Sequence, residues 1–258
     1  MKGFTLIFLF LSITLSAQDF SLKQKSLLEA DTFVGADSYG NYYFIKNNIL
    51  FKQGSNGTLK FGDYQLGKIS SVDIINPLKI LVFYKDLNTV VFLDNKLNEI
   101  ERINFNTLSN NMNINTATNA GNNRLWVFNL DTSQLELFNY RTLQKTIVSQ
   151  PFAGDLYSQA SNFNYCFILT DSKLLTFNVY GSLLFEMESL GYEKMVQQNE
   201  NLVVLKENSL FYISGNSVKP IKIPLSENKI KDLHLTQDLL YIYDGINILT
   251  YSLTYPKQ

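Results

Sequence analysis

Cysteine and histidine each occur only once in this chain of 258 residues, as Cys166 and His234. A lone cysteine cannot form an internal disulfide, and one residue of each kind cannot supply the several nitrogen and sulfur ligands that a zinc site normally needs. Cys166 lies in the apolar stretch NYCFILT, which favours a small buried side chain over a reactive thiol. We therefore expect no cofactor and no metal site built from these side chains, although backbone carbonyls could still hold a cation.

Charge and long apolar runs are also scarce. Only 17% of the residues are charged and the formal net charge is −1, with no basic stripe and no phosphate-binding glycine loop, so we expect no nucleic-acid partner. Past the N-terminus no segment approaches the roughly 18 apolar residues that a membrane-spanning helix needs. The 45% of hydrophobic residues are instead typical of a globular domain with a sizeable core.

The first residues, MKGFTLIFLFLSITLSAQ, follow the order of a secretory signal peptide. Lys2 is followed by an apolar stretch of about 12 residues, too short to span a bilayer as a permanent helix. Small residues Ser16 and Ala17 close it, so we expect a signal peptide over residues 1–17, although Leu15 makes the cleavage site imperfect. A buried amphipathic first helix is disfavoured because the stretch has no polar face. The mature chain, residues 18–258, is expected to be exported and to be periplasmic or associated with the outer membrane.

One sequence pattern recurs six times along the mature chain: an apolar run, a short polar break and a second apolar run. Both runs are rich in β-branched, aromatic and leucine residues, which is typical of a β-hairpin with a tight turn. The breaks follow one another at a spacing of roughly 40 residues, the length of a propeller blade. They fall at Asn47, Asp86, Asp131, Asp171, Glu207 and Asp244.

Each hairpin has a weaker strand candidate before it and another after it, such as ISSVDIIN and EIERINF in the second unit. Four strands in a unit of about 40 residues describe one blade. The sixth unit contains only three strand candidates before the chain stops. The segment DFSLKQKSLLEA at the mature N-terminus is a further strand candidate that belongs to none of the six units. We therefore predict an all-β, six-bladed β-propeller of four-stranded antiparallel blades, closed by the N-terminal strand completing the last blade. A stacked β-solenoid is the alternative, but its repeats would be more regular.

Two features leave alternatives open. The Asn- and Thr-rich segment at positions 104–123 predicts a solvated connection with one edge strand in it, or else a binding loop. Most aromatic residues at strand positions favour packing between blades over a platform for carbohydrate stacking. They are Tyr42, Tyr43, Phe44, Trp126, Phe128, Phe138, Tyr140, Tyr241 and Tyr243.

The blade patterns resemble the broad group of secreted six-bladed propellers that includes the NHL and YVTN repeat families. The likeness lies in the blade length, in hairpins such as NYCFILTDSKLLTFNVYGSLL and in the closing YGS and NGT turns. The chain is similar above all to exported propellers of Bacteroidota of the flavobacterial type, whose signal peptides end like the SAQ found here. The resemblance implies the fold and the compartment but no agreed activity.

Residues with catalytic chemistry are few. A proton-accepting histidine could only be His234, which alternates with leucines in KDLHLTQ and so shares a strand face with Asp232. If this strand lines the channel, the pair Asp232 and His234 is a candidate ligand-binding site. The alternative is a half-exposed polar strand face. The acids at the hairpin breaks are explained by turn chemistry, so we expect no catalytic residues there.

A rigid ring that holds many short loops suits broad contact with another protein. We therefore expect a non-enzymatic protein-binding module of the cell envelope, monomeric on its own. It could be an accessory or plug-like subunit of an outer-membrane machinery such as type IX secretion. The alternative is a small-molecule or glycan-acting enzyme, similar to lactonases or sugar dehydrogenases, with its site at the channel mouth. A scaffold that self-assembles through the edge of the disc is a third possibility.

Overall fold

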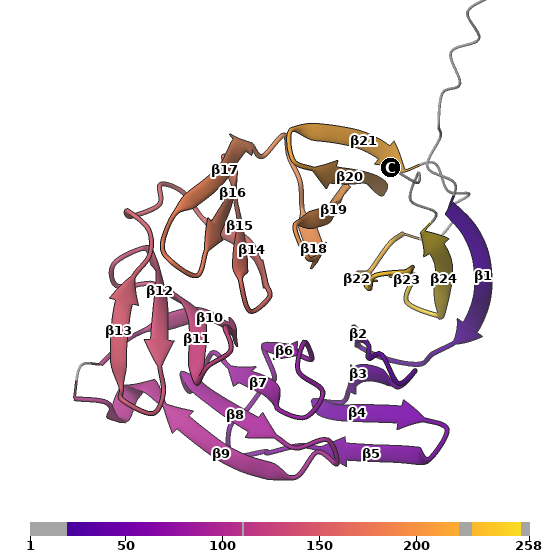
Figure 1. The fold of residues 1–258 in the computed structure, drawn as a ribbon. Coiled ribbons are helices and arrows are strands. Elements are labelled where there is room, and N and C mark those ends of the chain that lie inside the picture. Colours follow the sequence, from indigo (N-terminus) through magenta and orange to yellow (C-terminus); the bar gives the residue numbers. More distant parts are fainter. Residues whose placement is uncertain (1–19, 110, 222–228, 254–258) are drawn as a thin grey trace, which may run out of the picture.

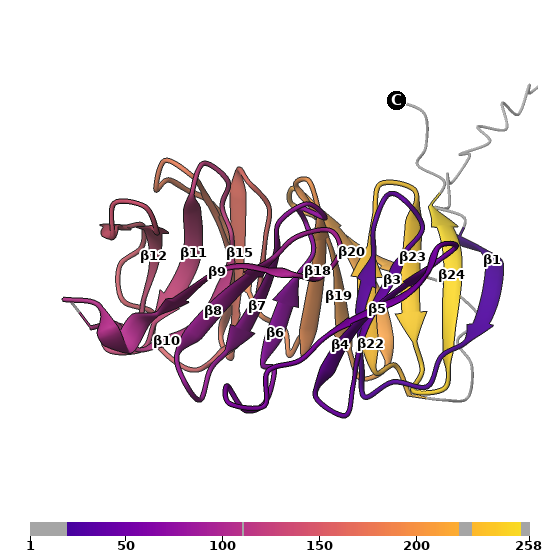
Figure 2. The same ribbon diagram turned by 90° about the horizontal axis from the view of Figure 1, so that it is seen from below.

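Six four-stranded antiparallel sheets stand around a central axis as the blades of a β-propeller (Figure 1). This computed structural model describes residues 20–109, 111–221 and 229–253, so the predicted signal peptide, residues 1–17, lies outside the described residues. Seen from the side, the blades form a disc whose strands run between its two faces (Figure 2). The predicted all-β fold with six blades is confirmed.

The strands are numbered along the chain. Blade 1 contains β2 (Thr32–Ala36), β3 (Tyr42–Lys46), β4 (Ile49–Gly54) and β5 (Gly57–Phe61). Blade 2 contains β6 (Ser71–Asp73), β7 (Ile80–Tyr84), β8 (Thr89–Leu93) and β9 (Glu99–Asn104). Blade 3 contains β10 (Ile114–Asn119), β11 (Arg124–Asn129), β12 (Gln134–Asn139) and β13 (Gln144–Ile147). Blade 4 contains β14 (Leu156–Ser161), β15 (Tyr165–Thr170), β16 (Lys173–Asn178) and β17 (Leu183–Glu188). Blade 5 contains β18 (Lys194–Gln198), β19 (Asn201–Lys206), β20 (Ser209–Ser214) and β21 (Ser217–Ile221). Blade 6 contains β22 (Asp232–Leu235), β23 (Leu239–Tyr243), β24 (Asn247–Leu253) and β1 (Phe20–Leu27).

All six polar breaks of the sequence lie in the turns between the two central strands of a blade. In blade 1, Asn47 and Asn48 both have positive φ, at 50° and 61°, which is the backbone that a two-residue hairpin turn requires. In blade 5, Glu207 and Asn208 adopt the same backbone, at 48° and 63°. The hairpin interpretation of the repeated pattern is confirmed.

The N-terminal strand closes the ring, as the sequence predicts. β1 pairs with β24 over its whole length, from Phe20 opposite Leu253 to Leu27 opposite Asn247. Tyr243 then fixes the link to blade 1, because its hydroxyl contacts the backbone of Ala30 at 2.8 Å. The last blade is therefore built from both ends of the described chain, and β24 has no open edge.

The core is divided into six hydrophobic clusters, one between each pair of neighbouring blades. The cluster between blades 2 and 3 packs Phe83 and Phe92 against Leu125 and Phe138, and the other joints follow the same plan. Central strands such as β7 and β8 therefore bury both of their faces, which explains why their sequences are continuously apolar rather than alternating.

The segment at positions 104–123 differs in part from the sequence-based expectation. It contains the expected strand, β10, but it also holds a 3-10 helix over Phe105–Thr107 and is less solvated than a polar connection should be. Phe105 and Met112 are buried in the cluster between blades 2 and 3. Asn88, in the hairpin turn of blade 2, holds the segment in place: it donates to Asn106 at 2.8 Å and accepts from the backbone of Ile114 at 3.2 Å.

Candidate functional site at the channel mouth

The innermost strands of the six blades enclose a channel of about 1350 Å³. Because successive strands of a blade alternate in direction, the turns between first and second strands and those between third and fourth strands lie on one face of the disc. We call it the mouth face, because turns of this kind line the channel opening, with Asp37, Ser38 and Gly40 in blade 1, residues 162–164 in blade 4 and residues 236–238 in blade 6. The opposite face carries the remaining turns and the links between blades, and we call it the link face.

The wall of the channel has two chemically different sides. Blades 1 and 2 provide most of the aliphatic residues, Val34, Val72, Ile74, Ile75 and Pro77, beside the carboxylates of Asp37 and Asp73. Blades 4 and 5 provide a side of amides and hydroxyls, formed by Gln159, Ser161, Asn162, Gln197 and Gln198. The channel can therefore receive a ligand that is itself part apolar and part polar.

Polar side chains on the innermost strands tie neighbouring blades together. Gln159 of blade 4 donates to Thr118 of blade 3 at 2.9 Å, and Gln197 of blade 5 donates to the Ser161 carbonyl of blade 4 at 2.8 Å. Between blades 1 and 2 no such bond joins the innermost strands in the described part of the chain, and Val34 and Val72 pack against the hydrophobic cluster there. A buried hydrogen bond contributes about 1 kcal/mol net, so these contacts mainly fix how the blades align.

His234 lies on β22 and lines the channel, so it is close to the ring axis as its strand position suggested. Its Nε2 is 3.0 Å from the carbonyl oxygen of Ala36 in blade 1, and a carbonyl can only accept, so Nε2 carries the proton. Burial lowers the pKa of His234 to about 4, against a weaker opposing effect of this hydrogen bond. The imidazole is therefore neutral at physiological pH and holds blade 6 to blade 1.

The imidazole of His234 lies against Gly35 of blade 1, a position with no room for a side chain. At Gly35 a β-carbon would lie 2.4 Å from Nδ1 of His234, and φ is +155°. The pairing of β2 with β3 also shifts register between Phe33 and Gly35, which marks a β-bulge. The bulge and the missing side chain together let the imidazole lie directly against the strand of the next blade.

Asp232, the second candidate residue, points between blades rather than into the channel. One carboxylate oxygen accepts from the backbone N–H of Phe33 in blade 1 at 3.0 Å. The other lies 3.0 Å from the Nζ of Lys194 in blade 5. The structure therefore brings Asp232 and His234 onto one strand face, but each side chain binds an adjacent blade and no hydrogen bond joins the two.

Asp73 on β6 is a channel residue that sequence reasoning missed. Its carboxylate accepts from the backbone N–H of Asn119 in blade 3 at 2.7 Å and from that of Ile75 at 2.9 Å. Burial raises the pKa of Asp73, and the two N–H donors oppose this effect. The strand ISSVDIIN was predicted correctly, but a partner 46 residues away leaves no local signal.

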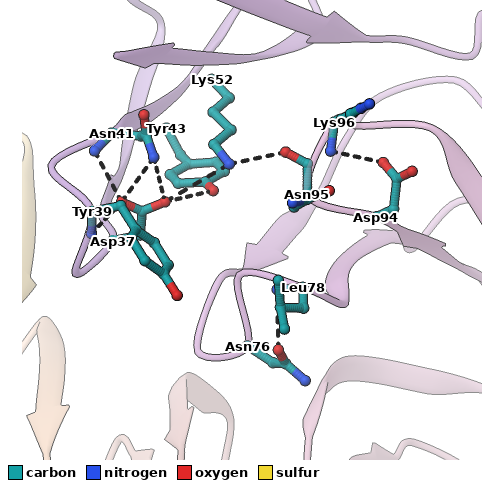
Figure 3. Close-up of polar contacts among 10 residues, drawn as sticks. All are labelled: Asp37, Tyr39, Asn41, Tyr43, Lys52, Asn76, Leu78, Asp94, Asn95 and Lys96. Carbon is teal, nitrogen blue, oxygen red and sulfur yellow. Dashed lines mark hydrogen bonds and ion pairs between the residues drawn. The ribbon is translucent and has the colours of Figure 1, made fainter. Parts of the chain in front are cut away.

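Asp37 is the most extensively bonded acid at the mouth (Figure 3). It accepts from the backbone of Tyr39 at 3.0 Å and Asn41 at 2.9 Å, and from the hydroxyl of Tyr43 at 3.0 Å. Burial, followed by the nearby carboxylate of Asp37, raises the pKa of Tyr43. Lys52 lies 3.9 Å from Asp37 and donates to the carbonyl of Asn95 in blade 2 at 2.9 Å. Asp37 thus shapes a turn and has a compensating charge.

The aromatic residues singled out in the sequence pack between blades, as predicted: Trp126, Tyr43 and Tyr243 are fully buried. Other aromatic residues stand free on the mouth face. Tyr39 is 74% exposed and its ring is turned away from the Asp37 contacts in Figure 3, and Tyr180 is 90% exposed. Sequence reasoning missed them because they lie in turns, where aromatic residues have no periodic pattern.

Within the described residues no three His, Cys, Asp or Glu side chains gather as a metal site would require. Cys166 is buried on β15, and burial raises the pKa of its thiol, in keeping with the predicted packing role. No helix of the described chain is long and apolar enough to cross a membrane.

Comparison with known proteins supports the fold. No family model and no curated protein matches the sequence. Among solved structures, virginiamycin B lyase from Staphylococcus aureus is 11% identical, with a TM-score of 0.64 over 92% of this chain and 100% of that one. PorZ, a surface component of the type IX secretion system of Porphyromonas gingivalis, is 15% identical, with a TM-score of 0.53 over 84% of this chain and 31% of that one. One is an enzyme and the other a secretion component, and at these identities the likeness shows the propeller fold alone.

Proposed function

We propose that this protein is a non-enzymatic binding module of the cell envelope and that its mouth face contacts a protein partner. One observation carries the proposal: the acid–base groups of the innermost strands are already bound to neighbouring blades, whereas large apolar and aromatic side chains on the mouth face are exposed. His234, Asp232 and Asp73 each bind a backbone group of another blade. A group held in this way stabilises the ring but is poorly placed to exchange protons with a substrate.

The free side chains have the chemistry of an interface. Tyr39 and Leu78 stand on neighbouring turns of blades 1 and 2, with 74% and 62% of their surface exposed (Figure 3). Phe163 and Tyr180 stand on two turns of blade 4, 41% and 90% exposed. Tyrosine and phenylalanine are enriched in protein interfaces because they bury a large area with few rotatable bonds. Short turns on a rigid ring hold them in place before binding.

The compartment in this proposal is supported by the N-terminal sequence, whose first 17 residues have the features of a signal peptide. Within the envelope, an accessory or plug-like role in type IX secretion is the first assignment to test. PorZ, a component of that system, shares the fold. The proposed partner is therefore an envelope protein, and the propeller is monomeric without it.

The test is affinity purification of the C-terminally tagged protein from gently solubilised envelopes, in two matched variants. Tyr39→Ser with Leu78→Ser alters the mouth face, and Tyr64→Ser with Leu190→Ser alters similarly exposed residues of the link face, 81% and 54% exposed. We expect a stoichiometric partner with the wild type and the link-face variant, and its loss with the mouth-face variant. Loss only with the link-face variant, or no partner at all, would refute the proposal.

A small-molecule or glycan-acting enzyme is the second candidate, because the channel is larger than the roughly 300–1,000 Å³ of common ligand pockets. Its reactive group would be Asp73, whose pKa burial raises. Turnover of a lactone or a sugar by the purified protein, lost in a folded Asp73→Asn variant, would favour this alternative.

A further inference from the structure

The charged residues that line the channel, taken over the described part of the chain, all carry carboxylates. They are Asp37, Asp73, Glu200 and Asp238, and no lysine or arginine lies among the lining residues. A concave site lined by one sign of charge focuses its field, because the surrounding protein is less polarisable than water. The channel is therefore negative although the chain as a whole is close to neutral, with a net charge of −1.

Two of these acids are placed to meet a ligand. Glu200 lies in the turn between β18 and β19, and Asp238 in the turn between β22 and β23, so both stand exposed on the mouth face. Glu200 accepts one hydrogen bond, from the hydroxyl of Tyr165 at 2.5 Å, which fixes the carboxylate at the rim. Asp37 is different, because Lys52 lies 3.9 Å from it and offsets its charge.

Two lysines of the mouth face, Lys52 and Lys79, have partners of their own. The ammonium of Lys52 binds the carbonyl of Asn95 and its side chain is only 12% exposed. Lys79 donates to the hydroxyl of Tyr140 at 2.7 Å and lies 3.8 Å from Glu101. These lysines are held at the junctions of blades 1, 2 and 3, whereas Glu200 and Asp238 lie on blades 5 and 6, and the described residues that line the channel with them include no lysine or arginine.

The side of the channel formed by blades 1 and 2 has the aliphatic residues Val34, Val72 and Ile74 in its wall, beside the bonded carboxylates of Asp37 and Asp73. A carboxylate rim across from an apolar wall matches the side chains of lysine and arginine, in which an aliphatic stem carries a cationic head. Exposed Tyr39 and Phe163 on the surrounding turns can also receive such a cation over their rings.

We propose that the channel mouth accepts a basic segment of the protein partner, a loop or terminus that carries lysine or arginine beside apolar residues. This inference rests on the proposed binding function and specifies the chemistry of the partner. The channel, at about 1350 Å³, has room for several side chains rather than one. Charge attraction at the rim accelerates and orients docking, and apolar contact inside the channel supplies affinity.

The test uses three fluorescent nonapeptides that differ only at three positions, which are lysine, serine or glutamate in a background of leucine, tyrosine and glycine. Binding to the full-length mature protein is followed by fluorescence anisotropy at low and physiological salt. We expect the lysine peptide to bind at least about tenfold more tightly than the serine peptide, and the glutamate peptide not to bind. Physiological salt should weaken the binding of the lysine peptide, since it screens the charges of Glu200 and Asp238 at the channel mouth.

Two variants with the same change in net charge provide the control. The double variant Glu200→Gln with Asp238→Asn should bind the lysine peptide about tenfold more weakly than the wild type. Glu188→Gln with Asp155→Asn removes two exposed acids from the end of β17 and from a link between blades, both on the link face, and should change binding less than about twofold.

An equal loss of affinity for the lysine peptide in both variants, or equal binding of the lysine and glutamate peptides, would overturn the inference. Spermidine serves as competitor, and displacement of the peptide by spermidine at lower concentration than the peptide itself would assign the site to a small polyamine instead. If the envelope partner still depends on Tyr39 and Leu78 while the lysine peptide fails to bind, this inference is wrong and the proposed function stands. If neither binds, both are wrong.

Discussion

Stability should fall as the pH drops from 6.5 towards 4, because His234 resists protonation only in the folded state. Burial lowers its pKa from 6.5 to about 4. Between these values the unfolded chain binds a proton that the folded chain excludes, so protons favour unfolding. Above pH 6.5 the imidazole is neutral in both states and has no such effect. The expected loss is therefore confined to the acid side of neutrality.

The size of the effect follows from the two pKa values. At pH 5 the unfolded state gains a factor of about 30 from protonation and the folded state almost none, which lowers the free energy of unfolding by about 2 kcal/mol. The limit below pH 4 is about 3 kcal/mol. With a urea m-value of about 3 kcal/mol/M for a domain of this size, the urea midpoint should fall by about 0.7 M between pH 8 and pH 5.

Urea unfolding can be followed through Trp126, the only tryptophan, which is fully buried between blades 3 and 4. The control is His234→Gln, because a glutamine can still donate to the Ala36 carbonyl but does not titrate. Asp73 has the opposite influence, since its pKa is raised and protons then favour the folded state, but it acts equally in both proteins. An equal midpoint shift for wild type and His234→Gln would refute the reasoning.

Three further predictions test the ring. Gly35→Ala should destabilise by about 2 kcal/mol, because the new β-carbon would lie 2.4 Å from the imidazole of His234; urea unfolding measures it. Removal of residues 20–27 should expose the edge of the last blade and cause aggregation in size-exclusion chromatography, which the peptide FSLKQKSL should reverse when added in trans. Lys145→Met should lower the free energy of unfolding by about 2 kcal/mol, because it removes the ammonium 3.0 Å from the buried carboxylate of Glu136 and leaves the neutral Asn129 amide, at 3.1 Å, to donate to it.

Each of these has a direct control. The cost of Gly35→Ala should largely vanish in a His234→Ala background, and an undiminished cost would mean that backbone strain rather than the clash is responsible. A scrambled strand peptide should not rescue the truncated ring. Adding Glu136→Gln to Lys145→Met should restore most of the stability, and a double variant as unstable as the single one would show that the ion pair is not the cause.

The sequence was sufficient to predict the blades because each hairpin carries a local signal. Turn residues such as Asn47 and Asn48, between two apolar runs, mark the centre of a blade wherever the chain repeats them. Ring closure was predictable by counting strands. β10 was harder, because its sequence INTATN faces the channel with small polar side chains and has little of the apolar character of a strand.

The functional surface was less predictable, because it depends on contacts between blades. The sequence placed His234 and Asp232 on one strand face but could not show that each binds blade 1. It also gave no reason to expect that Glu136, on a central strand, is fully buried beside Lys145. Such contacts depend on how two blades align, and periodicity within one blade does not encode that alignment.

The pairing of β1 with β24 has a consequence for the order of folding. Ser21 and Ser252, whose hydroxyls meet across this pair, are 231 residues apart in the chain. Closing a loop of that length costs about 3 kcal/mol more entropy than joining hairpin partners about ten residues apart. The hairpins should therefore form early and this pairing late, since non-local contacts form slowly. Every newly made chain must pass through an open arc of blades before it becomes a ring.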